Sequence, residues 1–347
     1  MSIATRGKWS GRTSGTLIFC VALATVVAVA QKAAGSGADE ADELWRFEGP
    51  NIAKVAQFTA KQQATVLFTV DGLVGYATAG TARRLDLPRG GSGCANLNPA
   101  LSHDGRLVAF ITGEEAGNCR IAIFEIASGK VRPLIDLKSD PGQLPWSWDD
   151  SEIAFFHWSL SDPSVQAVSI RDGSVRTIAP FNQLAAHGLP FGYLVRFDAS
   201  APVQWMHSGS GLLVGIIGDV PTRQPNACDV EFSIELAKNG VLTKFSDGYD
   251  AVVSPIADRI AWYAGSKIVV ANVDGTDRRV LSGSPRWMGI MPEDLGGSLT
   301  WSPDGKQLFF GVVVSENCSD DVYLLQVDNG RYKRFLHHSC IAILDWR

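Results

Sequence analysis

Six histidines have the side chains best suited to acid–base or metal chemistry in this chain: His103, His157, His187, His207, His337 and His338. His103 and His207 lie in short segments rich in Ser, Asp and Gly, which are typical of solvated turns. The His337–His338 pair, with His187 and His157, is the set from which a divalent metal site would be built. These residues are scattered along the chain, so we expect no cofactor and keep a divalent metal as the weaker alternative.

Motifs for nucleophilic or phosphate chemistry are missing from the sequence. No G-x-S-x-G segment is present, so the nucleophile of an α/β-hydrolase is absent. The run 90–93 (GGSG) precedes neither a helical pattern nor a lysine and is not a phosphate loop. The acidic pairs Glu114–Glu115 and Asp320–Asp321 do not have the spacing of a calcium loop, so we expect solvated charges. The residues therefore favour a protein that is not an enzyme, without deciding the question.

The charge balance argues against polyanionic ligands. The chain has 31 Lys and Arg against 36 Asp and Glu, which gives a net charge of -5. Nucleic acids and anionic membrane surfaces are bound by an excess of Lys and Arg that neutralises phosphates. We therefore expect no nucleic-acid partner.

A repeated strand–turn–strand unit sets the fold, and its clearest copy is WSPDGKQLFF at 301–310. Related segments with the same spacing lie at 101–110, 146–155, 205–214 and 253–262. Ser, Pro, Asp and Gly form the turn, and the apolar run after it forms a strand. We expect the repeated Trp residues to fill the space between repeats, and Asp104 and Asp304 to cap their own turns.

A second series of glycine-containing turns accompanies the first: Gly80, Gly129, Gly173, Gly240, Gly275 and Gly330. They recur about every 50 residues, and four-stranded units of about 40 to 50 residues are typical of β-propeller blades. Six such turns predict an all-β fold, a six-bladed β-propeller of four-stranded antiparallel blades over 62–347. The first blade lacks its innermost strand, so we expect Ile341–Trp346 to join it and close the ring.

The WSPDGK unit and its variants resemble the WD-related repeats of TolB-like β-propellers, and the resemblance covers nearly all of the chain after residue 30. Propellers with such repeats serve as periplasmic scaffolds, enzyme domains and secreted binding proteins, so the resemblance implies the fold and not the function. TolB carries an α/β domain before its propeller, and 31–61 is too short for one. We expect a TolB-like propeller without that N-terminal domain.

The first thirty residues have the order of a secretory signal. A basic region precedes the uncharged run Leu17–Ala30, which ends in Ala-Val-Ala. This run spans about 21 Å as a helix, which is short for a bilayer core. We expect 1–30 to be a signal peptide, 31–61 a flexible acidic spacer and lead-in segment, and the protein periplasmic or secreted. An uncleaved N-terminal membrane anchor is the alternative.

Five cysteines follow the signal: Cys94, Cys119, Cys228, Cys318 and Cys340. If the strands of a blade are named a to d from the centre outward, these cysteines all lie in b–c or d–a connections, at one face. We expect the disulfides Cys94–Cys119 and Cys318–Cys340, which an exported protein keeps. Cys228 is left over, and sequence does not determine the connectivity.

The same face carries the longest connections, at 181–200 and 283–297, and we call it the loop face. Loops longer than the scaffold requires are where recognition usually lies. The candidate binding residues in them are Phe191, Tyr193, Arg196, Arg286, Trp287 and Met291. These side chains would equally serve to pack the loops onto the propeller.

The sequence predicts an exported, non-enzymatic binding or scaffold propeller. Its partner would be an envelope or extracellular protein or glycan, bound through the loop face by a monomer. The alternative is a metal-dependent propeller lyase or hydrolase with His and acidic ligands.

Overall fold

A computed structural model describes residues 49–70, 73–88, 99–113, 118–138, 141–157, 164–180, 203–221, 228–265, 267–281, 299–313 and 320–347. Within these ranges the side chains of 216–221, 228–232, 313, 320 and 338 are not described. All of the described residues belong to one compact unit, 38–221 with 228–347.

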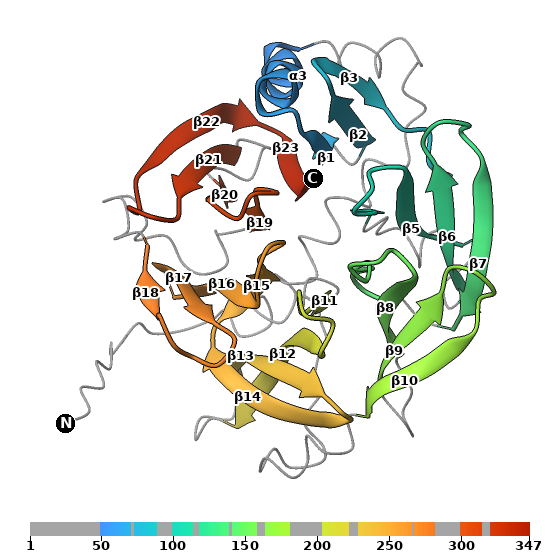
Figure 1. Ribbon diagram of the computed structural model, residues 1–347, viewed down its shortest axis with the longest axis vertical. Helices are drawn as coiled ribbons and strands as arrows, with labels where there is room; N and C mark the ends of the chain where they lie inside the picture. The colour runs from blue at the N-terminus through green and yellow to red at the C-terminus, as the bar shows by residue number, and fades with distance from the viewer. Residues whose placement is uncertain are drawn as a thin grey trace, which may run out of the picture. The chain divides into compact units, whose positions relative to one another are not determined.

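Six antiparallel sheets are arranged as the blades of a propeller (Figure 1). Blade 1 contains β23 (Ile341–Trp346), β1 (Thr65–Val70), β2 (Leu73–Thr78) and β3 (Thr81–Arg84); blade 2 contains β4 (Ala100–Leu101), β5 (Leu107–Gly113), β6 (Cys119–Glu125) and β7 (Val131–Leu137). Blade 3 contains β8 (Glu152–His157), β9 (Ser164–Ser169) and β10 (Val175–Pro180); blade 4 contains β11 (Val203–Trp205), β12 (Leu212–Pro221), β13 (Cys228–Lys238) and β14 (Val241–Asp247). Blade 5 contains β15 (Tyr249–Val253), β16 (Arg259–Ala264), β17 (Lys267–Asn272) and β18 (Arg279–Val280); blade 6 contains β19 (Thr300–Trp301), β20 (Gln307–Val313), β21 (Asp320–Gln326) and β22 (Tyr332–Ser339).

The predicted ring closure is confirmed. β23 pairs antiparallel with β1, from Val66 opposite Trp346 to Val70 opposite Ile341. Beyond that ladder, the backbones of Thr65 and Arg347 exchange two hydrogen bonds of 2.6 and 2.8 Å. The first and last strands of the propeller therefore complete one sheet, which removes the two open edges that an unclosed ring would expose.

Blade 3 differs from the other five because its inner strand is reduced to an isolated bridge. Trp146 pairs with Ile153 there, and no longer ladder forms. Pro141 and Pro145 lie in this inner segment, and proline has no N–H to donate to a ladder. The tight turn that follows Trp146 is nevertheless closed as in the other repeats, with Ser147 N donating to Glu152 O at 2.9 Å.

The Ser-x-Asp turns cap themselves, as the sequence predicts. The Ser302 hydroxyl donates to Asp304 at 2.6 Å, and the backbone N–H of Gln307 donates to the Ser302 hydroxyl at 2.8 Å. Ser102 with Asp104 and Ser147 with Asp149 repeat the arrangement at 2.7 Å. These aspartates are thus engaged in holding their own turns.

Glycine is required in the second series of turns because all six adopt left-handed backbone conformations. Their φ values lie between 67° and 85°, a region where a Cβ atom clashes with the backbone. At Gly330 an added Cβ would also lie only 2.0 Å from the carbonyl oxygen of Leu281 in blade 5. That turn therefore needs glycine for space as well as for conformation.

Six buried clusters lie between neighbouring blades, one at each junction. The repeated tryptophans cross these junctions, as expected. The indole N–H groups of Trp146, Trp205 and Trp301 donate to carbonyls of Ala100, Pro145 and Val252 in the preceding blades, at 2.9 to 3.2 Å. Each blade thus buries both of its faces, which explains why only 19% of the residues are charged.

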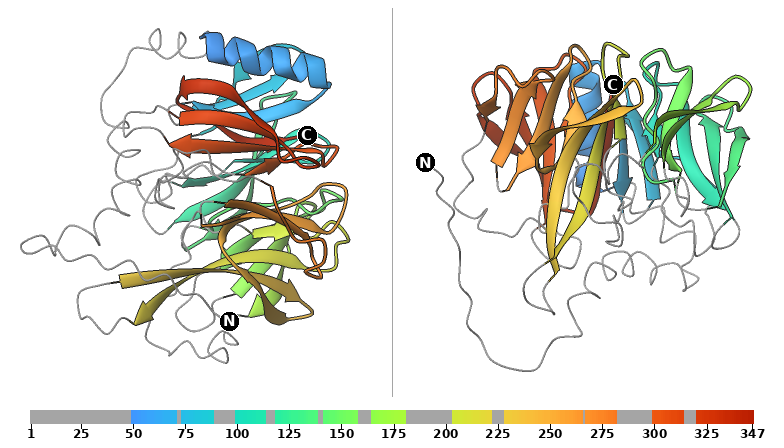
Figure 2. Two further views of the ribbon diagram at one scale, coloured as in Figure 1. Left: turned by 90° about the vertical axis from the view of Figure 1, so that its left-hand side faces the viewer. Right: turned by 90° about the horizontal axis from the view of Figure 1, so that it is seen from below.

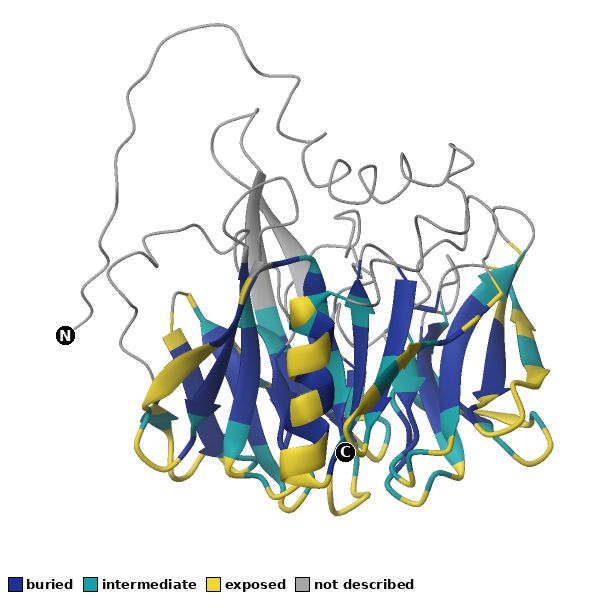
Figure 3. Ribbon diagram, turned by 90° about the horizontal axis from the view of Figure 1, so that it is seen from above, coloured by how far each residue is buried: buried dark blue, intermediate teal, exposed yellow. Residues whose placement is uncertain are grey.

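A helix, α3 (Pro50–Gln62), covers the junction where the ring closes. All but its last residue lies in the stretch 31–61 that the sequence analysis assigned to a flexible spacer and lead-in segment. Its buried face includes Ile52, Val55 and Phe58, and its exposed face points outward (Figure 3). The sequence analysis did not predict this helix, because it assigned the whole stretch from the acidic, glycine-containing first part. Its signals were present, namely proline at the first helical position and apolar residues three or four apart.

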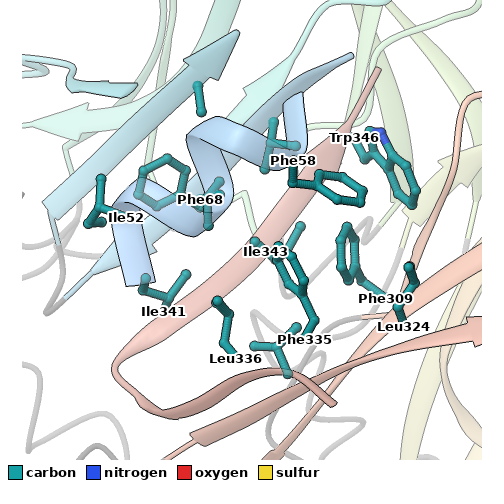
Figure 4. Close-up of a cluster of buried hydrophobic side chains, with 14 of the residues drawn as sticks. Ile52, Phe58, Phe68, Phe309, Leu324, Phe335, Leu336, Ile341, Ile343 and Trp346 are labelled. Atoms are coloured by element: carbon teal, nitrogen blue, oxygen red, sulfur yellow. The ribbon is translucent and has the colours of Figure 1, made fainter. Parts of the chain in front are cut away.

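Phe58 packs into an aromatic cluster between blades 6 and 1 (Figure 4). Its ring centroid lies 5.2 Å from that of Phe309 and 5.0 Å from those of Phe335 and Trp346. Phe309 and Phe335 belong to blade 6, and Trp346 belongs to the closing strand β23. The helix therefore bridges the two ends of the ring.

Candidate functional site

The strands run from one face of the propeller to the other (Figure 2). The a–b and c–d turns lie at one face, the turn face, where each connection is short. The b–c and d–a connections lie at the loop face, and these include the longest breaks between strands, from β10 to β11 and from β18 to β19.

The six candidate binding residues fall outside the described part of the chain: Phe191, Tyr193, Arg196, Arg286, Trp287 and Met291. Their role stays a prediction. The connection that contains the last three begins after Leu281 and ends before Leu299. Both of these leucines belong to the same buried cluster as Tyr323 of blade 6.

At the loop-face end of blade 6, a buried carboxylate contacts two basic side chains. Asp321, in β21, is 5% exposed. Its Oδ1 lies 2.8 Å from His337 Nδ1, and its Oδ2 lies 3.2 Å from Arg334 Nη1. The Tyr323 hydroxyl donates to Oδ2 at 3.2 Å. The carboxylate thus lies behind an outer layer formed by Arg334 and His337, whose side chains are 49% and 52% exposed.

A β-bulge brings these two side chains to one face of the blade. In β22 an extra residue, Phe335, lies between the residues that pair with Tyr323 and Val322. Side chains alternate along a regular strand, so Arg334 and His337, three residues apart, would point to opposite faces. The bulge shifts the alternation by one residue, and both side chains reach the same carboxylate.

The carboxylate determines the chemistry of its neighbours. Burial, followed by the nearby charge of Asp321, raises the pKa of Tyr323 to about 12, so the phenol stays protonated and donates. A carboxylate only accepts hydrogen bonds, so His337 donates from Nδ1. Arg334 keeps donors beyond the Nη1 group that contacts the carboxylate. The cluster is therefore equipped to recognise an anionic group.

The sequence analysis singled out Asp321 but predicted the burial of its side chain wrongly. The pair Asp320–Asp321 was expected to be solvated rim charge, whereas Asp321 is buried. The apolar run VYLL, which follows it, indicated a strand but not that strand's register against β22. The bulge that brings Arg334 and His337 together has no sequence signal that we can identify.

The turn face has a second polar group, with a structural role. Asp150 accepts hydrogen bonds from the backbone N–H of His103 at 2.8 Å and of Asp104 at 3.0 Å, and contacts the His103 ring at 2.8 Å. The Trp148 ring lies 4.3 Å from that of His103 and 5.0 Å from that of His207. The His103 side chain is only 17% exposed, so its expected solvation was wrong; His207 is exposed as expected. These contacts join the turns of blades 2, 3 and 4.

Among the described residues, no group of three or more His, Cys, Asp or Glu side chains is placed to hold a metal ion. His187 and the side chain of His338 lie outside what the structure describes. Of the helices in the described ranges, none is long and apolar enough to cross a membrane.

The structure describes Cys119 and Cys340, one cysteine of each predicted disulfide. Cys119 is buried at the start of β6 and is disulfide-bonded, but the sulfur at the other end of that bond is not described. Cys94 and Cys318 lie outside the described residues, as does the side chain of Cys228. Cys340 is half-buried between β22 and β23. Both pairings stay predictions.

No known protein family matches this sequence, and no curated protein matches it. Solved structures do resemble the fold. TolB from Acinetobacter baumannii is 14% identical with a TM-score of 0.54, over 82% of this chain and 67% of that one. A chain of the nidogen/laminin complex is 11% identical with a TM-score of 0.53, over 82% and 97%.

An oligogalacturonate lyase in complex with manganese is 14% identical with a TM-score of 0.50, over 81% of this chain and 75% of that one. At such low identities the likeness concerns the fold and not the activity. Together with the repeats and the six closed blades, it shows that the chain folds as a TolB-like six-bladed β-propeller.

Proposed function

We propose that this protein is an exported, non-enzymatic binding propeller that recognises an envelope or extracellular protein or glycan through its loop face. The observation that carries the proposal is the difference between the two faces. At the turn face the polar side chains of the repeats are engaged in capping and joining turns. At the loop face Arg334 and His337 are half exposed and held in place from behind, beside the ends of a long connection.

Export and disulfide bonding belong to the same proposal. The segment 1–30 would direct export as a signal peptide, or as an uncleaved anchor. Cys94–Cys119 and Cys318–Cys340 would then form outside the cytoplasm and hold the loop face. Peptide mapping without reductant would show these two cross-links, and another connectivity would contradict the pairing.

The test of the function is capture of a partner by chemical cross-linking in the native envelope fraction. Arg286→Ala with Trp287→Ala should weaken capture while the melting temperature stays nearly unchanged, because both residues lie in a connection outside the blades. Arg106→Ala is the control, since this side chain is 80% exposed at the turn face. Equal capture by the unmodified protein, the Arg286→Ala/Trp287→Ala variant and the Arg106→Ala variant would refute recognition through the loop face.

A metal-dependent lyase or hydrolase is the rival function. The observation in its favour is the likeness in fold to an oligogalacturonate lyase whose structure contains manganese. Elemental analysis separates the two proposals. Stoichiometric metal that disappears in His187→Ala or His337→Ala would favour the enzyme over the binding propeller.

A further inference from the structure

The outer edge of blade 6 carries a row of exposed basic and aromatic side chains. We call this row the basic stripe: Arg331, Tyr332, Lys333, Arg334 and His337, all exposed along β22 and the residue before it. Tyr332, Arg334 and His337 lie on one side of this edge strand, and Arg331 and Lys333 lie on the other. At about 3.3 Å per residue the row is about 20 Å long. It is a local excess of positive charge on a chain whose net charge is -5.

Outer strands of the other blades differ because each of their basic residues has a partner. Arg83 and Arg132 donate to the backbone carbonyls of Ile126 and Ile170, and the others pair with surface acids. The pairs are Arg84–Asp86, Arg120–Asp136, Arg176–Glu152, Lys244–Asp247 and Arg279–Asp277. Within the described part of the chain, neither Arg331 nor Lys333 makes an ion pair. Lysine and arginine on an edge strand also deter aggregation, but that role does not require a buried carboxylate beneath one of them.

Arg334 is the residue of the basic stripe whose side chain is held in position by a buried carboxylate. Its acidic partner, Asp321, is buried, whereas the acids of the five other pairs are 23% to 86% exposed. One Nη1 contact holds the guanidinium, and about half of the side chain faces solvent. A guanidinium fork binds a carboxylate through two parallel hydrogen bonds, and holding it in advance reduces the entropy lost on binding.

We propose that the basic stripe binds an acidic, extended segment of a partner protein, and that Arg334 binds one of its carboxylates. The inference rests on the proposed binding function and specifies its partner. Cations spaced along a strand match several carboxylates along an extended peptide. Tyr and Arg are also enriched in protein interfaces.

The direct test uses fluorescence anisotropy of a short labelled Glu–Ser peptide with the full chain. Arg334→Gln should weaken binding about five- to tenfold, because it removes a charge-assisted contact. The matched control is Lys267→Gln, which removes one exposed positive charge at the loop-face end of blade 5. That variant should change affinity less than about twofold. A Gln–Ser peptide should not bind.

A positioning role for Asp321 makes a separate prediction. Asp321→Asn makes the stripe more positive, so general attraction alone would tighten peptide binding. If the carboxylate positions Arg334, the same change weakens binding instead. Tighter binding by this variant, or equal losses in Arg334→Gln and Lys267→Gln, would overturn the inference.

An acidic glycan is the competing ligand, and a uronic-acid oligosaccharide measured in parallel tests it. Binding of the oligosaccharide without binding of the peptide would overturn the assignment to a protein segment. Failure of the stripe differs from failure of the proposed function. If envelope capture persists while Arg334→Gln has no effect on peptide binding, only the stripe is refuted; peptide binding without any captured partner refutes the proposed function.

Discussion

Removal of the Phe58 ring is the sharpest test of how the propeller is closed. Phe58 is 9% exposed, and its side chain contacts those of Phe309 and Phe335 in blade 6 and of Trp346 in the closing strand β23 of blade 1. Strands of blades 6 and 1 line the site, so the space left by the ring would be filled only in part. Phe58→Ala should therefore reduce the free energy of unfolding by about 3 to 5 kcal/mol. For a domain of this size that corresponds to a fall in Tm of about 6 to 20 °C.

Chemical denaturation measures the loss, and Gln57→Ala is the control on the exposed side of the same helix. The control should change the free energy of unfolding by less than about 0.5 kcal/mol. Hydrogen exchange adds a local readout, because amides of β1 and β23 should exchange faster in Phe58→Ala while those of β8 and β9 change less. A loss below about 1 kcal/mol, or uniform exchange in all blades, would refute the role of α3 at the closure.

Three further predictions concern turns and charges. Gly330→Ala should cost at least about 2 kcal/mol more than Gly129→Ala in urea unfolding. Both glycines have φ near 67°, but only at Gly330 would the new Cβ meet backbone; equal costs would contradict this. Asp321→Asn should lower the pKa of Tyr323 from about 12, measured by ultraviolet titration, because an anionic neighbour is removed; an unchanged pKa would show that burial alone raises it. Hydrogen bonds from Ser174 lower the pKa of Asp172 from 3.8 to about 2, so its stabilising effect is present above pH 3.8 and is lost as the pH falls towards 2. Asp172→Asn should flatten that part of the acid unfolding curve, and an unaltered curve would refute the assignment.

The sequence by itself determined the fold because the determining interactions are local. The Ser302 hydroxyl caps a turn only a few residues away, and Gly330 supplies the positive φ that its own turn requires. Such requirements recur with each blade and can be counted along the chain. Ring closure was also predictable, since the missing inner strand of the first blade has its counterpart at Ile341–Trp346.

The tertiary structure alone decided how helix α3 and the polar cluster of blade 6 are placed. The amphipathic face of α3 was visible in the sequence, but the aromatic surface that receives Phe58 comes from the distant C-terminal part of the chain, in blade 6 and β23. The cluster depends on a one-residue shift in the pairing of β21 with β22. The apolar pattern and the turn set most of the pairing register, but a bulge shifts it by one residue, and the position of this bulge is defined only in the folded blade. That is why Asp321 is buried, and why Arg334 and His337 face the solvent together.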